Sequence, residues 1–136
     1  MPNWCSNVIY LKHEDHAQLE RAENALKRGE FMNEFLPIPE GADWYTWHVE
    51  NWGTKWDVES ESISYQGDIL VATYDSAWAP PIGFYHYLLK LGFVVRALYY
   101  EPYQIFCGIF DNGDDEHYNL DDLNIPTELK EEFGLE

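Results

Sequence analysis

Basic residues are scarce in this sequence of 136 residues. It holds 8 Lys and Arg against 25 Asp and Glu, which gives a formal net charge of −17 at pH 7. A chain with this charge repels polyphosphate and anionic lipid at long range. The composition therefore argues against binding of nucleic acid through a basic face, and we expect no direct nucleic-acid partner.

Cysteine and long apolar runs are lacking as well. Cys5 and Cys107 are too few and too far apart in sequence for a disulfide framework or a four-ligand zinc site, so we expect reduced, buried thiols. No run approaches the ~20 apolar residues that span a bilayer, and the N-terminus lacks the charged start and apolar stretch of a signal peptide. We therefore expect a cytoplasmic protein with no membrane partner.

Aromatic residues, in contrast, are abundant. Six Trp, ten Tyr and seven Phe contribute to an apolar fraction of 46%, which is enough to build a core without a disulfide, a metal or a cofactor. The length suits a single domain over residues 1–136. We expect one domain that needs no cofactor and no metal.

The spacing of apolar residues predicts helices over three ranges: 15–28, 81–91 and, as one short helix, 126–133. Residues 31–45 carry two prolines and a glycine within five residues. This composition predicts a long, irregular connection rather than a regular element.

Strand patterns occupy much of the remaining chain. Residues 52–65 are predicted to form a hairpin with 69–74, and further strands are predicted over 7–12, 93–100, 103–110 and 117–120. The resulting order is strand, helix, strand, strand, helix, strand. It predicts an α+β fold of the ferredoxin-like, split βαβ type: an antiparallel sheet of four or five strands with both long helices on one face, plus an extra C-terminal strand and short helix.

Aromatic and polar residues alternate in several predicted loops. An indole offers a large flat surface and one N–H donor, which suits stacking against a base, a sugar or a partner side chain. The competing interpretation is that these rings wedge the loops onto the sheet. We expect Lys55 to pair with Asp75 or Glu101, or to donate to loop carbonyls. The candidate loop site comprises Asn3, Trp4, Asn51, Trp52, Lys55, Asp75 and Trp78.

Acidic residues are concentrated near the C-terminus. Residues 111–136 hold ten acids and one Lys, whereas residues 69–110 hold only two acids. The stretch 111–117 lacks the ligand spacing of an EF-hand, so we interpret it as a solvated turn and not a metal site. The candidate acidic surface comprises Asp114, Asp115, Glu116, Asp121 and Asp122.

No residue pattern points to catalysis. A cysteine nucleophile would need a histidine within hydrogen-bond reach, and nothing local pairs Cys5 or Cys107 with His48, His86 or His117. We therefore assign no catalytic residue.

Four short motifs occur in order along most of the chain: residues 1–7 (MPNWCSN), 51–56 (NWGTKW), 77–81 (AWAPP), and 99–102 (YYEP) together with 106–108 (FCG). In these motifs the sequence resembles the YubB-like family of small phage- and plasmid-encoded proteins. The resemblance implies a ferredoxin-like fold, an origin in a mobile genetic element and no established activity. It adds no catalytic residue and does not extend to the acidic end.

Two hypotheses of function remain open. In the first, the protein is a non-enzymatic accessory protein that binds a host or mobile-element protein, such as a basic nucleic-acid-handling or defence protein. An anionic surface on a rigid scaffold can compete with phosphate for a basic cleft, although the same charge also serves solubility. In the second, the Trp-rich loops build a pocket for a small molecule or nucleotide, with or without catalysis, and Lys55 meets its phosphate or carboxylate.

Overall fold

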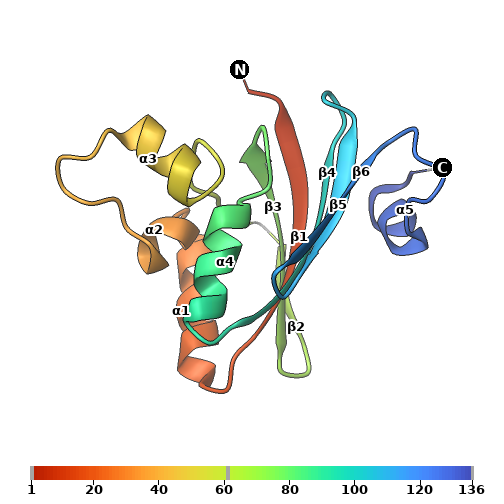
Figure 1. The fold of residues 1–136 in the computed structure, drawn as a ribbon. Coiled ribbons are helices and arrows are strands. Elements are labelled where there is room, and N and C mark those ends of the chain that lie inside the picture. The colour runs from red at the N-terminus through yellow and green to blue at the C-terminus, as the bar shows by residue number, and fades with distance from the viewer. Residues whose placement is uncertain (1, 61, 136) are drawn as a thin grey trace.

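The computed structural model describes residues 2–60 and 62–135. Within these residues the chain forms one antiparallel sheet of six strands in the order β2-β3-β1-β4-β5-β6. Helices α1 to α4 lie on one face of the sheet and α5 lies on the other (Figure 1). The elements are β1 (Trp4–Lys12), α1 (His16–Lys27), α2 (Phe31–Phe35), α3 (Trp44–Asn51), β2 (Ser62–Gln66), β3 (Ile69–Ala77), α4 (Ile82–Lys90), β4 (Val94–Glu101), β5 (Phe106–Asp111), β6 (Asp114–Asn119) and α5 (Thr127–Phe133).

The α+β class and the antiparallel sheet agree with the sequence prediction, but the predicted four or five strands are too few. The chain continues after β4 into two further strands, β5 and β6, and each pairs antiparallel with the strand before it. The turn between them uses Asn112 and Gly113, both at positive φ, as Asn-Gly pairs do in tight hairpins.

Helices α1 and α4 form where apolar spacing predicted them. The side chain of Asp15 caps α1 by accepting a hydrogen bond from the backbone N–H of Ala17 (3.0 Å). Both helices bury their apolar stripe against alternate residues of the central strands, such as Ile9 and Leu11 of β1. The main core therefore lies between the sheet and these helices.

The predicted strand over 52–65 is wrong for most of its length. Trp52 ends α3, and only Ser62–Gln66 is a strand, which forms the predicted hairpin with β3. The loose alternation of apolar residues arises because loop residues such as Trp52 and Val58 pack into the core. Loop packing and strand pairing leave the same pattern in a short window.

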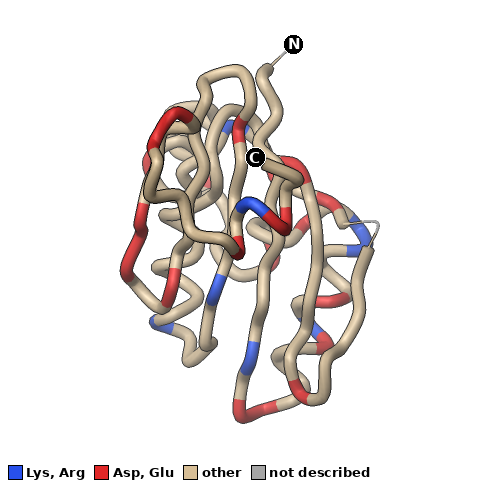
Figure 2. Tube along the Cα trace, turned by 90° about the vertical axis from the view of Figure 1, so that its right-hand side faces the viewer, with Lys and Arg blue, Asp and Glu red and all other residues tan. Residues whose placement is uncertain are grey.

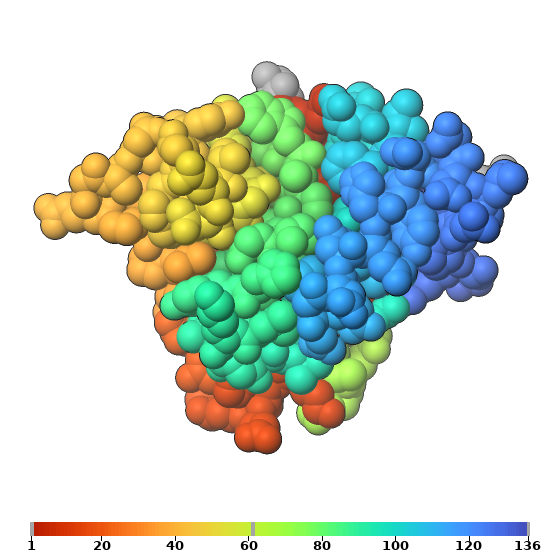
Figure 3. Space-filling model, in the orientation of Figure 1, coloured from red at the N-terminus to blue at the C-terminus, as the bar shows by residue number. Residues whose placement is uncertain are grey.

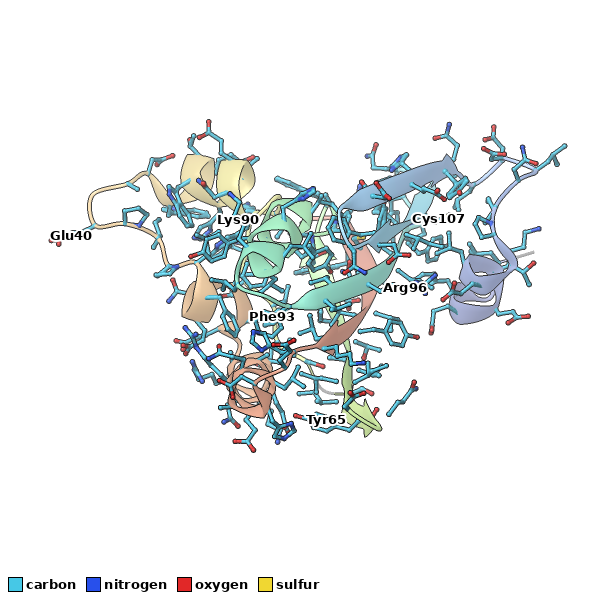
Figure 4. All side chains as sticks on the ribbon, turned by 60° about the horizontal axis from the view of Figure 1, so that its bottom comes forward. Glu40, Tyr65, Lys90, Phe93, Arg96 and Cys107 are labelled. Atoms are coloured by element: carbon cyan, nitrogen blue, oxygen red, sulfur yellow. The ribbon has the colours of Figure 1, made fainter. Side chains whose placement is uncertain are left out.

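The predicted irregular connection over 31–45 is wrong at both ends. Helix α2 begins at Phe31, and α3 begins at Trp44, where the Asp43 side chain accepts from the N–H of Thr46 (3.1 Å). The N–H groups of α2 are satisfied by a side chain distant in sequence, Asp57. The residues between the two helices project from the body of the molecule (Figure 3), and Glu40 lies on this projection (Figure 4).

The loop before β2 protects the exposed edge of β3. Pairing between β2 and β3 ends at Ser62 and Thr73, so β3 residues beyond that point have a partner strand on one side only. The Ser60 hydroxyl donates to the carbonyl of Thr73 (2.6 Å), and the Thr54 hydroxyl donates to that of Ala77 (2.7 Å). These bonds hold the loop, and Trp56 within it, against this end of the sheet.

A second, smaller core lies between the sheet and α5. It contains Leu98, Cys107, Ile109, Ile125 and Leu129. Arg96 on β4 forms a bidentate ion pair with Glu128 of α5, including a bond of 2.6 Å from Nη2 to Oε2. Figure 4 shows Arg96 and Cys107 on this side of the sheet. Among the described residues, no helix has both the length and the apolar character needed to cross a membrane.

The two cysteines are buried and free, as predicted, and they lie in strands that are not neighbours in the sheet. Strand β4 separates β1, which carries Cys5, from β5, which carries Cys107. Their side chains also lie on opposite faces of the sheet. Cys5 is four residues before Ile9 in β1, so its side chain points to the same face as Ile9, toward the main core, whereas Cys107 lies in the smaller core.

Candidate functional site

Three exposed aromatic rings surround one half-buried cation at the end of the sheet where β1 begins, and a fourth ring adjoins them. The Lys55 ammonium lies 4.5 Å from the ring centroid of Trp56, 5.2 Å from that of Trp78 and 5.8 Å from that of Tyr45. Trp4 extends the group, since its ring centroid is 6.1 Å from that of Trp56. We call Trp4, Tyr45, Lys55, Trp56 and Trp78 the aromatic cluster.

The cluster is assembled from four separate segments. Trp4 starts β1, Tyr45 lies in α3, Lys55 and Trp56 lie in the loop before β2, and Trp78 follows β3. The rings are 38% to 41% exposed. Exposed Trp and Tyr rings in one group are uncommon on a protein surface that has no partner, because they leave a large apolar area in water.

The backbone at Trp78 is held in an unfavourable conformation. Its φ angle is +67°, a left-handed value that a bulky residue rarely adopts. The N–H of Ala79 bonds to the carbonyl of Ala77 (2.8 Å), which closes a γ-turn around Trp78, and the N–H of Trp78 bonds to the carbonyl of Asn3 (2.7 Å). These bonds fix the Trp78 ring beside the start of β1.

Two residues of the predicted loop site do not belong to this surface. Trp52 is 2% exposed, donates from Nε1 to the carbonyl of Leu36 (2.9 Å) and stacks on His48 with ring centroids 3.9 Å apart. The Asn51 side chain donates to the carbonyl of Trp47 (2.9 Å). Trp52 is thus a core residue, and Asn51 closes α3, because the chain turns inward at the end of that helix.

The predicted ion pair of Lys55 with Asp75 or Glu101 is also wrong. Across residues 2–60 and 62–135, Lys55 has no carboxylate within 4.0 Å. Glu101 is instead buried in the turn after β4, where its carboxylate accepts from the N–H groups of Tyr103 and Gln104. The rings around Lys55 provide the favourable electrostatic environment that a carboxylate was expected to supply.

A cleft of about 600 Å³ adjoins the aromatic cluster. It lies over β1 and β3 on the face of the sheet that carries α5, in the part that α5 leaves uncovered. Its lining includes Trp4, Ser6 and Asp75 from the strands, Glu59 from the loop before β2, and Glu132 from α5. Trp4 therefore belongs to both the cluster and the cleft, and Asp75 to the cleft.

Asp57, which also lines the cleft, has a fixed structural role. Its carboxylate accepts from the backbone N–H groups of Met32 (2.8 Å), Asn33 (2.9 Å) and Val58 (2.8 Å). Burial raises the pKa of this carboxyl above its ordinary value, and the three N–H donors oppose that rise. Asp57 thus joins the loop to α2.

The five residues of the candidate acidic surface are all exposed, but they do not form one continuous surface. Successive side chains of β6 point to opposite faces of the sheet, so Asp115 faces away from Asp114 and Glu116. Asp115 accepts from the Tyr99 hydroxyl (2.6 Å), Glu116 from the Tyr118 hydroxyl (2.7 Å), and Asp122 from the N–H of Asn124 (2.8 Å). Acidic positions lie in several separate parts of the trace, and basic ones are sparse (Figure 2).

Buried polar groups lie close to the cluster but inside the core. Burial raises the pKa of Cys5 to about 12, and the hydroxyls of Tyr74 and Tyr85 bond to each other in the same core. Asn7 donates to the carbonyl of Cys5 (2.9 Å) and the hydroxyl of Ser76 (2.9 Å). The described residues contain no group of three or more His, Cys, Asp and Glu that could hold a metal ion.

Sequence reasoning missed Tyr45, Trp56 and Glu132. Two sequence features could have pointed to Trp56. It lies within the motif at residues 51–56, and its neighbour Lys55 is a single basic residue among loop aromatic residues. No sequence pattern predicts that Glu132 lies at the site, because its position depends on how α5 folds back over β4.

Comparisons with known proteins give little further information. No family model matches the chain, and no curated protein matches it. One solved structure that resembles it is protein api92 from Yersinia pseudotuberculosis, described with the family model DUF1281. The two are 17% identical over 65% of this chain, with a TM-score of 0.46, and the matched part spans 38% of the length of api92.

Proposed function

We propose that the protein is a binding module that engages a partner protein through the aromatic cluster. The observation that carries this proposal is a group of four exposed aromatic rings from four segments, three of them around Lys55 and the fourth, Trp4, beside Trp56. Trp and Tyr contribute most of the binding energy at many protein interfaces, and rings that are already fixed lose little entropy on binding.

A protein partner fits the electrostatics better than a nucleotide. The formal charge of −17 repels a phosphorylated ligand. Lys55, the one cation assigned to such a ligand, is instead engaged by three rings, and Trp52 is not available for stacking. The small-molecule alternative therefore loses two of the groups on which it depended.

The acidic residues are proposed to act at long range. A negative protein attracts a basic partner before contact and raises the association rate, whereas charges at the rim of an interface add little to the final affinity. On this proposal the residues Asp114, Asp115, Glu116, Asp121 and Asp122 steer the partner, and the aromatic cluster binds it.

The resemblance to the YubB-like family supports the proposal of a phage or plasmid accessory protein with a host or mobile-element partner. The sheet order supports a related proposal about ancestry. Strands β2-β3-β1-β4, with α1 following β1 and α4 following β3, form a unit that we propose to be ferredoxin-like, and β5 and β6 extend it at one edge.

Affinity capture with matched variants tests the proposal. The tagged protein is used to capture partners from host lysate, and each captured protein is then purified and bound again to three variants. The first lacks two rings of the cluster (Trp56→Ala with Trp78→Ala). The second carries Asn or Gln at the five acidic positions. The third, Tyr65→Ala, removes a 37% exposed ring at the opposite end of the sheet.

The proposal expects affinity to fall by about thirtyfold or more in the first variant, since two interface aromatics often contribute over 2 kcal/mol. The neutralised variant should bind more slowly and with a flatter dependence on salt, at nearly unchanged dissociation rate. Tyr65→Ala should bind normally. Equal affinity of the wild type and the double Trp variant for the purified partner would contradict the proposal.

A further inference from the structure

The cleft beside the aromatic cluster is negatively charged throughout. Four acidic residues line it, Asp57, Glu59, Asp75 and Glu132, and its lining contains no Lys, Arg or His. In the part of the chain that the structure describes, Glu59, Asp75 and Glu132 have no basic side chain within 4.0 Å. Unlike Glu34 or Glu128, which pair with arginines, these carboxylates leave their charge uncompensated.

The cleft also has aromatic walls. Trp4 lines one part of it and is 39% exposed, and Phe133 of α5 lines the other side. Phe133 is held by its packing against Tyr100, with ring centroids 5.5 Å apart. A flat ring next to free carboxylates suits a planar cation, which can stack on the ring and donate hydrogen bonds from its edge.

The cleft is fixed on both sides. On one side the loop before β2 is tied to β3 through Ser60 and to α2 through Asp57. On the other side the bidentate pair of Arg96 with Glu128 holds α5 on the sheet. In Figure 1 α5 lies on this face, and the other helices lie on the opposite face of the sheet. A site with fixed walls binds a ligand with little entropic cost.

We propose that this cleft binds an arginine side chain from a basic segment of the partner protein. The guanidinium stacks on Trp4 and donates to the carboxylates of Asp75 and Glu132, while the aromatic cluster contacts the rest of the segment. Arginine is favoured over lysine because its planar, weakly hydrated group combines stacking with bidentate pairing. The volume of about 600 Å³ exceeds one side chain and leaves room for adjoining backbone. This inference rests on the proposed function for its statement that the ligand is a protein.

Titration of isotope-labelled protein with a short peptide tests the inference directly by NMR. The probe is acetyl-Gly-Arg-Gly-Arg-Gly-amide, and the matched control peptide carries citrulline, which has nearly the same shape without the charge, at both arginine positions. We expect saturable shifts of the Trp4 indole N–H and of the backbone amides of Ser6 and Asp75. The citrulline peptide should bind at least about tenfold more weakly, because hydrogen bonds between charged groups contribute about 1.5 to 3 kcal/mol.

Charge variants separate a defined site from general attraction to a negative protein. Asp75→Asn with Glu132→Gln removes two charges from the cleft. The control, Glu14→Gln with Glu40→Gln, removes two exposed charges that belong neither to the cleft nor to the candidate acidic surface. The cleft variant should bind the arginine peptide about tenfold more weakly. The control variant should change the affinity by less than about twofold, since exposed charges outside the cleft are screened by salt.

Equal losses in the two charge variants, or shifts spread over the whole surface, would overturn the inference. So would equal binding of the arginine and citrulline peptides. The Trp56→Ala, Trp78→Ala protein distinguishes this failure from failure of the proposed function, because it keeps every residue assigned to arginine. If it loses the partner while wild type shows no peptide binding at the cleft, only the cleft assignment is wrong.

Discussion

Tyr99 on β4 lies directly opposite Gly108 on β5, and its hydroxyl passes over that glycine to bond Asp115 on β6 (2.6 Å). A Cβ atom at position 108 would clash with the Tyr99 ring and lie 2.5 Å from the carbonyl oxygen of Glu116. The glycine thus provides the space through which a core side chain reaches the edge strand. Burial, and secondarily Asp115, raise the pKa of the Tyr99 hydroxyl, so it remains a donor.

Gly108→Ala should therefore destabilise the protein. Overpacking of a well-filled core costs about 1 to 3 kcal/mol, and backbone as well as side-chain atoms must move here. Urea denaturation measures the loss. Gly41→Ala is a useful control because no atom lies within 4 Å of its added Cβ, although its φ of +83° carries a cost of about 1 to 2 kcal/mol. The clash is disproved if Gly108→Ala unfolds at the same urea concentration as wild type.

Glu128 should make stability depend on pH. The hydrogen bond from Arg96 lowers the pKa of this carboxyl, so the unfolded chain binds more protons there as pH falls. The stabilisation from the Arg96–Glu128 ion pair is complete above the pKa of glutamate in the unfolded chain, about 4.3. It is lost as the pH falls through the lower pKa that Glu128 has in the folded state. Glu128→Gln should cost up to about 1 kcal/mol at neutral pH, given the partial exposure of the pair.

The control for this measurement is Glu131→Gln, which removes the same charge from an exposed position of α5. It should leave stability unchanged or raise it slightly, because it relieves repulsion in a very acidic protein. Denaturation curves at pH 7 and at about pH 2.5 should show the Glu128 effect at the first pH only. If Glu128→Gln is less stable than the wild type by the same amount at the lower pH, the loss of stability comes from packing and not from the ion pair.

Trp78 offers a way to separate function from stability. Glycine adopts the left-handed φ of this position without cost, whereas alanine retains about 1 to 2 kcal/mol of strain. Trp78→Gly should therefore be about 1 kcal/mol more stable than Trp78→Ala, and both should lose partner binding to the same degree. Thermal denaturation ranks the two variants. The reverse order of stability would mean that the backbone at this position is not strained.

The thiols should be slow to react in the native protein. Burial raises the pKa of Cys5 to about 12 and also raises that of Cys107, so little thiolate exists at neutral pH and neither sulfur is accessible. Alkylation followed by mass spectrometry should modify both cysteines only on addition of denaturant. Modification of Cys107 alone under native conditions would indicate that α5 leaves the sheet.

Local rules predicted α1 and α4 well because a start signal and an apolar stripe coincide in each segment: Asp15 caps α1, and Pro81 directly precedes α4. They failed over 31–60, where the decisive interaction is Asp57 with the N–H groups of α2, a contact between distant residues. The sequence predicted the candidate site only in part, for the same reason. Trp4, Lys55 and Trp78 lie in loop segments where aromatic and polar residues alternate, and this pattern is visible in the sequence. The burial of Trp52 in the core and the position of Glu132 in the cleft lining depend on how the chain folds.

Strand β6 ends the sheet with unpaired backbone groups, and such an edge is an obvious template for another strand. The mutual repulsion of Asp114, Asp115 and Glu116 keeps two copies of this edge apart at neutral pH. Acidification toward the sequence pI of about 4.4 removes the net negative charge of the chain, while the edge backbone of β6 can still pair. Mild acid should therefore turn the protein from a dispersed species into one that aggregates edge to edge, with β6 as the first point of contact.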